Sequence, residues 1–212
     1  MIVTDGIEEY FSLMRQKPEL FVPSDVYPIV TDRAVLEAFQ RESGKRVGVL
    51  YKSCFNTLVV DLVGGEGGYF TYERVIPTSN ECGVVCVPVM DGKFLLLRQY
   101  RHPIRERQLC FPRGFGEDGI SPEENAKKEL WEETGAIAKH CAYIGSLTPD
   151  SGLIGAGCRV FLCFVDSLKE EALVEGIENT LWLDERELEE KIKKREINDG
   201  FTLGAYMLYK TK

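Results

Sequence analysis

The residues whose types and spacing best fit chemistry are three glutamates, Glu129, Glu132 and Glu133. In a helix, Glu129 and Glu133 lie one turn apart on the same face, and Glu132 lies beside both. Neither Glu129 nor Glu133 has a basic residue three or four positions away. Crowded carboxylates provide the oxygen ligands that Mg²⁺ requires. The spacing therefore predicts a site for one or more Mg²⁺ ions.

The helix that must position these glutamates is expected over Ser121–Thr134. Ser121 can cap its first turn together with Glu124, and Gly135 is a good terminator. The last turn carries carboxylates where the helix dipole favours cations, which costs about 0.3–1 kcal/mol for each. A solvated acidic face is the alternative interpretation. We prefer the metal site because a bound cation would explain why carboxylates occupy this unfavourable end of the helix.

The remaining elements indicate an α+β protein with a mixed-sheet α/β/α sandwich. Val-, Leu-, Tyr- and Phe-rich strands are expected over 46–53, 55–63, 68–76, 82–90 and 93–100, and further strands at about 142–147, 158–165 and 180–183. Helices are expected at about 184–195 and 200–210. Residues 1–45 differ from the rest: helical spacing over Ile7–Arg15 and Thr31–Ser43 flanks a proline-punctuated segment, which indicates a helical extension.

The composition argues against several classes of binding partner. The net charge of −8, from 34 acidic and 26 basic residues, argues against duplex nucleic acid, whose affinity for proteins comes mainly from cations. No apolar stretch approaches the roughly 18 residues that a membrane span needs, and the N-terminal residues do not resemble a signal peptide. Seven scattered cysteines are expected to be reduced core thiols in a cytoplasmic protein rather than ligands of a structural metal.

At this point the sequence resembles the Nudix hydrolase superfamily. Its box begins here at Gly114 and ends with the run KELWEETGA, Lys128–Ala136, with the spacing intact. Two positions depart, because Ile120 stands where the box has glutamate and Lys128 where it has arginine. The resemblance implies that one supporting ion pair is lost while the three core carboxylates remain. Glu117 is a candidate substitute for the missing glutamate.

The resemblance extends beyond the box, over about residues 46–210. The segments GKFLLLRQYRHPI, LCFPRGFGE and LTPDSGLIG look like those of ADP-ribose pyrophosphatases and related nucleoside-diphosphate-sugar hydrolases. This branch implies a β-rich, dimer-forming subdomain at 46–80 and a hydrolase domain at 81–212, with 1–45 outside the match. The expected assembly is a homodimer.

The resemblance also implies roles for individual residues. Mg²⁺, or Mn²⁺ as a substitute, would be held by Glu129, Glu132 and Glu133, helped by a backbone carbonyl near Arg113 and Gly114. A further carboxylate would act as base or ligand, and the sequence leaves Glu175 and Glu178 open. The candidates for contact with the substrate are Arg98, Arg101, Arg113 and Pro149, and arginine can clamp diphosphate oxygens.

Two functions from different classes remain open at this point. The first is a hydrolase that splits ADP-ribose or a related nucleoside diphosphate sugar into a nucleoside monophosphate and a sugar phosphate. The second is a non-catalytic Nudix-fold module that binds such a ligand, favoured only by Ile120 and Lys128. A dinucleotide-binding loop at Gly114–Gly119 is disfavoured, since Glu117 and Asp118 would repel a pyrophosphate.

Overall fold

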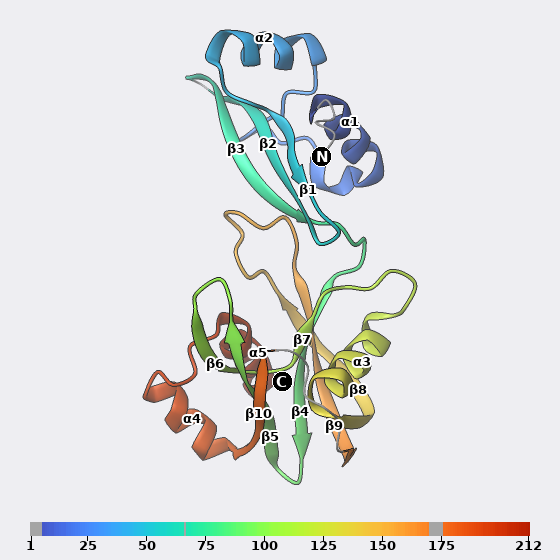
Figure 1. Ribbon diagram of the computed structural model, residues 1–212, viewed down its shortest axis with the longest axis vertical. Helices are drawn as coiled ribbons and strands as arrows, with labels where there is room; N and C mark the ends of the chain where they lie inside the picture. Colours follow the sequence, from blue (N-terminus) through green and yellow to red (C-terminus); the bar gives the residue numbers. More distant parts are fainter. Residues whose placement is uncertain (1–5, 66, 170–175) are drawn as a thin grey trace. The chain divides into compact units, whose positions relative to one another are not determined.

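The computed structural model describes residues 6–65, 67–169 and 176–212 (Figure 1). The chain divides into two units, which are described separately. Unit 1 comprises the chain up to Asn80 together with Asp150–Ala156, and unit 2 comprises Glu81–Pro149 and Gly157–Lys212.

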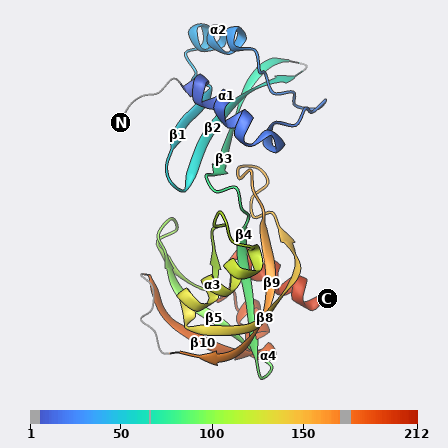
Figure 2. The same cartoon turned by 90° about the vertical axis from the view of Figure 1, so that its right-hand side faces the viewer.

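Unit 1 is a small antiparallel sheet covered by N-terminal helices. Its strands are β1 (Gly48–Lys52), β2 (Asn56–Gly65) and β3 (Gly68–Pro77), in the order β1-β2-β3, and its helical elements are α1 (Gly6–Gln16), the 3-10 turn η1 (Pro18–Phe21) and α2 (Arg33–Ser43). Helix α1 lies across the sheet (Figure 2), and its Ile7 and Tyr10 belong to the same hydrophobic cluster as Val59 and Leu62 of β2. The helices and the sheet therefore share one hydrophobic core.

A buried ion pair fastens α1 to this sheet. Asp61 on β2 is only 2% exposed. Its carboxylate accepts hydrogen bonds from the Arg74 guanidinium on β3, with 3.0 Å between Nη2 and Oδ1, and from the hydroxyl of Tyr10 on α1. The Arg74 guanidinium also stacks over the Phe21 ring, 4.9 Å from its centroid. Because these charges are paired and hydrogen-bonded, their burial is tolerated.

Unit 1 also includes a segment from the second half of the chain. In Asp150–Ala156, the Leu153 carbonyl accepts from the Val75 amide at 2.8 Å, and the Gly155 amide donates to the Val75 carbonyl at 3.0 Å. The Tyr72 hydroxyl donates to the Gly152 carbonyl at 2.9 Å. This segment thus pairs with the outer edge of β3.

Unit 2 is built on a mixed sheet. In the described residues its strand order is β10-β5-β4-β9-β8, with β6 paired to β5 and β7 paired to β4. The strands are β4 (Gly83–Met90), β5 (Lys93–Arg101), β6 (Glu106–Cys110), β7 (Arg113–Gly114), β8 (Ala136–Leu147), β9 (Cys158–Leu168) and β10 (Ile177–Asp184). The pairing of β4 with β9 is parallel, whereas the neighbouring pairs are antiparallel.

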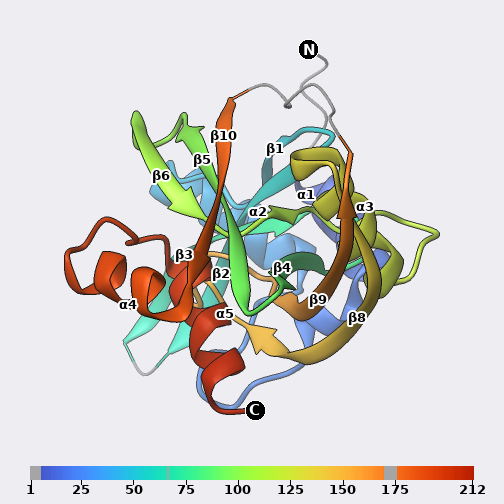
Figure 3. The ribbon, with the colours of Figure 1, turned by 90° about the horizontal axis from the view of Figure 1, so that it is seen from below.

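Alternation along the central strand explains why helices cover both faces of this sheet. On β4, Val84 and Cys86 pack in the core beneath α3 (Pro122–Thr134). Val85 and Val87 point to the other face, where α5 (Gly200–Lys210) packs on β4 and α4 (Glu185–Lys193) packs on β5 and β10 (Figure 3). The predicted mixed-sheet α/β/α sandwich, preceded by helices and a small β-rich part, is confirmed.

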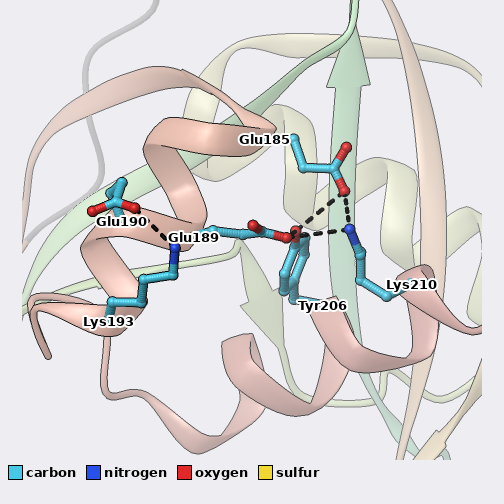
Figure 4. A network of polar contacts seen from close by, with 6 residues as sticks. All are labelled: Glu185, Glu189, Glu190, Lys193, Tyr206 and Lys210. Carbon is cyan, nitrogen blue, oxygen red and sulfur yellow. Dashed lines mark hydrogen bonds and ion pairs between the residues drawn. The ribbon is translucent and has the colours of Figure 1, made fainter.

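Polar contacts hold α4 and α5 together (Figure 4). The Tyr206 hydroxyl on α5 donates to the carboxylate of Glu189 on α4 at 3.0 Å and approaches Glu185 at 3.3 Å. The Lys210 ammonium binds the same two glutamates. With the aromatic packing of Tyr206 on Phe94, these contacts fix the C-terminal helix on the sheet.

Some details differ from the sequence expectations. Strands β6 and β7 were not expected, and β8 begins at Ala136 rather than at about residue 142. All seven cysteines are free, but Cys54 and Cys82 are exposed while the other five are buried as expected. Within the described ranges, no helix is long and apolar enough to cross a membrane.

We predict that Asp61→Ala lowers the free energy of unfolding by about 3–5 kcal/mol, because it leaves the Arg74 guanidinium without its buried counter-charge. Urea unfolding monitored by circular dichroism measures this change. Glu73→Ala is the matched control, since Glu73 is exposed on β3, and it should change stability by less than about 0.5 kcal/mol. Equal effects of the two substitutions would contradict the role given to Asp61.

Candidate functional site

Helix α3 has the boundaries that its sequence predicts. The Ser121 hydroxyl accepts from the Glu124 amide, and the Glu124 carboxylate accepts from the Ser121 amide at 3.0 Å, which completes a capping box. Gly135 ends the helix in the left-handed region, with φ of 70°. The helix therefore presents its last two turns, with their glutamates, next to the β7 segment.

Two of the three glutamates lie against the backbone of Arg113 and Gly114. The Glu133 carboxylate accepts a hydrogen bond from the Arg113 amide at 2.9 Å. Glu129 lies so close to Gly114 that a Cβ added there would come within 1.9 Å of the Glu129 carboxylate. A side chain at position 114 would therefore displace this carboxylate from its place beside the backbone.

The two carboxylates are partly withdrawn from water, and the pKa of each is raised. Burial raises the pKa of Glu133 to about 7, and the nearby charge of Glu129 adds to this, although the Arg113 amide acts in the opposite direction. The pKa of Glu129 is also raised, first by burial and then by the charge of Glu132. A divalent cation would relieve this repulsion, so the pair fits a hard metal ion that prefers oxygen ligands.

Glu132 has a different environment from its two neighbours. Its carboxylate is 3.9 Å from the Lys128 ammonium, which also binds Glu117. Lys128 thus finds a carboxylate in the preceding loop, and the predicted loss of an ion pair is better described as its replacement by Lys128–Glu117. In the described chain no three Asp, Glu, His or Cys side chains are gathered closely enough to hold a metal. The convergent set is therefore Glu129 with Glu133.

Arg101 and Arg113 carry buried donors that lack a partner. Arg101, at the end of β5, donates from Nη2 to the Cys110 sulfur at 3.2 Å, but its buried Nε has no acceptor among the described residues. The buried Nη1 of Arg113 likewise has none. Both positive charges lower the pKa of Glu133, so they lie in the electrostatic environment of the carboxylates. Unpaired buried N–H groups are costly, and an anionic ligand would satisfy them.

Asp199 and Phe201 also belong to this site, although no chemistry was assigned to them from the sequence. Asp199, which caps α5, pairs with the Arg113 guanidinium at 3.2 Å. The Phe201 ring lies under the same guanidinium, with 4.0 Å between the ring centroid and Cζ. The available signal was the Asp199-Gly200 start of a C-terminal helix, which predicts a cap but not a partner for arginine.

Other predicted residues lie apart from this group or cannot be placed. Arg98 is three residues from Arg101 on β5 and therefore faces the other side of the sheet. It is 3.6 Å from Glu178 on β10, whose carboxylate also binds Arg107. Pro149 is exposed after β8. The remaining candidate, Glu175, lies outside the described residues.

The raised pKa of Glu133 predicts how the stability of the metal-free protein depends on pH. The folded state binds a proton more tightly than the unfolded state, so this contribution to stability is lost as pH rises from about 4.5 to about 7. Relative to Glu133→Gln, the wild type should lose about 3 kcal/mol across this range. Urea unfolding in EDTA at pH 5 and pH 8 measures it, and a pH-independent difference would contradict the burial of Glu133.

Comparison with known proteins places this geometry in a family. The NUDIX domain model matches residues 81–202. The chain is 30% identical to the ADP-ribose pyrophosphatase of Bacillus subtilis, over 74% of this chain and 89% of that protein. It is 34% identical to ADP compounds hydrolase NudE of Escherichia coli over 44% of this chain, an alignment that spans only 50% of NudE.

A crystal structure of an ADP compounds hydrolase has a similar fold, with a TM-score of 0.66 at 20% identity, covering 78% of this chain and 90% of that one. The family match contains both β7 and α3, and hence the contacts of Glu129 with Gly114 and of Glu133 with Arg113. The chain belongs to the NUDIX domain family.

Proposed function

We propose that the protein is a Mg²⁺-dependent hydrolase that cleaves the diphosphate bond of ADP-ribose or a related nucleoside diphosphate sugar. The products would be a nucleoside monophosphate and a sugar phosphate. The observation that carries this proposal is the approach of Glu129 and Glu133 on α3 to the backbone of Gly114 and Arg113. The similarity to an ADP-ribose pyrophosphatase supports the choice of substrate class.

The metal ligands in this proposal are the convergent carboxylates of Glu129 and Glu133, with the backbone at Gly114. Glu132 would join them only by leaving Lys128. A bound Mg²⁺, or Mn²⁺ in its place, supplies charge neutralisation for the diphosphate and acidifies a coordinated water. Mg²⁺ keeps several water ligands, so two convergent carboxylates are sufficient to hold it. Ionised Glu133 is the form that binds metal, and the Arg113 amide favours that form.

The substrate contacts in this proposal come from arginines around the carboxylates. Arg101 and Arg113 have buried N–H groups that phosphate oxygens would satisfy. Arg98 and Pro149 are the other predicted substrate contacts, and Arg98 would first have to leave Glu178. The further carboxylate would be Glu175 or Glu178, and Glu178 would first have to leave Arg107.

The assembly in this proposal is a cytoplasmic homodimer formed by the β-rich residues 46–80, with 1–45 as a helical extension. Strand β3 is an edge of the unit 1 sheet. Asp150–Ala156 pairs with this edge near Val75, and the N-terminal half of the strand exposes Tyr69, Phe70 and Tyr72 at 56%, 37% and 39%. Clustered exposed aromatic side chains mark interaction surfaces, and an open strand edge can pair with a second chain. A second copy of this chain is the proposed occupant.

Hydrolysis is tested by incubating the protein with Mg²⁺ and ADP-ribose, GDP-mannose, UDP-glucose or NADH and separating the products by chromatography. We predict a nucleoside monophosphate from at least one substrate, with ADP-ribose preferred, and no product in EDTA. Glu133→Gln should lower kcat by at least about 100-fold, because it removes a metal ligand.

The matched control for this assay is Glu123→Gln. Glu123 lies on the same helix but pairs with Lys127 at 2.8 Å, away from Gly114, so its loss should leave kcat within about twofold. Tight binding of the substrates without product over hours would overturn the hydrolase and favour the binding module. Equal loss of activity in both variants would contradict the assignment of the site.

Light scattering after size exclusion tests the dimer, which is predicted to have twice the chain mass of 24.0 kDa. Tyr69→Ser combined with Phe70→Ser should raise the dissociation constant by at least about tenfold, because it removes exposed aromatic area from the proposed interface. Tyr51→Ser on the opposite edge strand, β1, is the control, since Tyr51 is 55% exposed. A monomeric wild type, or dissociation by Tyr51→Ser alone, would refute this interface.

A further inference from the structure

Arg113 makes two separate contacts, one through its backbone amide and one through its guanidinium. Its backbone amide donates to Glu133 at 2.9 Å. Its side chain extends away from that contact to Asp199, with 3.2 Å between Nη2 and Oδ1, and packs over the Phe201 ring. Asp199 and Phe201, which hold the guanidinium, therefore also restrain Arg113, whose backbone amide binds the predicted metal ligand Glu133.

The Arg113 guanidinium is held on one side and unsatisfied on the other. Asp199 occupies Nη2 and Phe201 covers one face, whereas the buried Nη1 has no acceptor in the described residues. Burial lowers the pKa of Arg113, while the Asp199 carboxylate opposes this and keeps the side chain charged. A charged and immobilised guanidinium with one unused N–H donor is well suited to binding an anion.

Asp199 is itself fixed by a closed set of hydrogen bonds. Its Oδ2 accepts from the Thr202 amide at 2.9 Å and from the Thr202 hydroxyl at 2.7 Å, while its Oδ1 faces Arg113. The Thr202 hydroxyl in turn accepts from the Phe111 amide at 2.9 Å. Two residues of the segment preceding the Nudix box are thereby bonded to the first turn of α5. Asp199 is 5% exposed, so little water competes for these contacts.

We propose that Asp199 is a positioning residue: with Phe201 it holds the Arg113 guanidinium so that Nη1 is presented to a diphosphate oxygen of the substrate. This inference rests on the proposed function and adds to it a residue that does not contact the substrate. Because Asp199 acts through Arg113, its removal weakens substrate binding more than it slows the chemical step.

The variant that tests this inference is Asp199→Asn. Asparagine caps helices as well as aspartate does, so α5 keeps its start while the counter-charge of Arg113 is removed. Asp184→Asn is the matched control, because Asp184 caps α4 in the same way but has no arginine ion pair among the described residues. Phe201→Leu is a second test variant, which leaves the cap intact should Asp199→Asn fail to fold.

The first readout requires no activity. In ¹⁵N NMR spectra of arginine side chains, the wild type should give resolved, slowly exchanging guanidinium signals for Arg113. Asp199→Asn should broaden or average these signals, and Asp184→Asn should leave them unchanged. Unaltered Arg113 signals in Asp199→Asn would overturn the inference.

The second readout is a double-mutant cycle with ADP-ribose as substrate. Asp199→Asn should raise KM by about tenfold with kcat within about twofold, as expected for the loss of one well-placed charge-assisted contact. In an Arg113→Ala background the same substitution should have no further effect on KM. Additive effects would overturn the inference. A wild type without hydrolase activity defeats the proposed function alone, and the NMR result then decides the role of Asp199.

Discussion

The site depends on holding two like charges one helical turn apart, partly away from water. Glu129 and Glu133 can be held in this way only because the opposing segment contributes backbone rather than side chain: position 114 has no Cβ, and the Arg113 amide supplies a donor. The mixed sheet fixes that segment by pairing β7 with β4, and the capping box fixes the helix. Strain between the carboxylates is thus built into the fold, where a cation can relieve it.

Much of this arrangement was predictable because it depends on local rules. The Ser121 cap and the Gly135 terminator define α3, and the spacing of its glutamates follows from helical geometry. Alternation of Val84 and Cys86 with Val85 and Val87 explains why the central strand is buried on both faces. The sandwich and the convergent glutamates could therefore be predicted before the structure was known.

The contacts that were missed join residues far apart in sequence. Asp199 pairs with Arg113 across 86 positions, whereas Lys128 pairs with Glu117, the substitute that the sequence had suggested. Short strands such as β7 have too few residues to show a periodic pattern, so their pairing with β4 could not be read locally. Arg98 and Arg101 were both predicted to contact the substrate because both lie at the end of one strand, yet strand alternation sends their side chains to opposite faces.

The pairing of Asp150–Ala156 with β3 has a consequence for modularity. The segment belongs to unit 1, while the residues on both sides of it belong to unit 2, so the units interleave along the chain. Cutting the chain after Asn80 would not separate the two units, because Asp150–Ala156 folds with unit 1. The Leu153 carbonyl and the Gly155 amide would lose their hydrogen bonds to the backbone of Val75. The segment Asp150–Ala156 would then be exposed without the strand it pairs with. Unit 1 therefore cannot be removed by a single cut in the chain. Fusing residues up to Asn80 to another protein would likewise leave out the segment that completes unit 1.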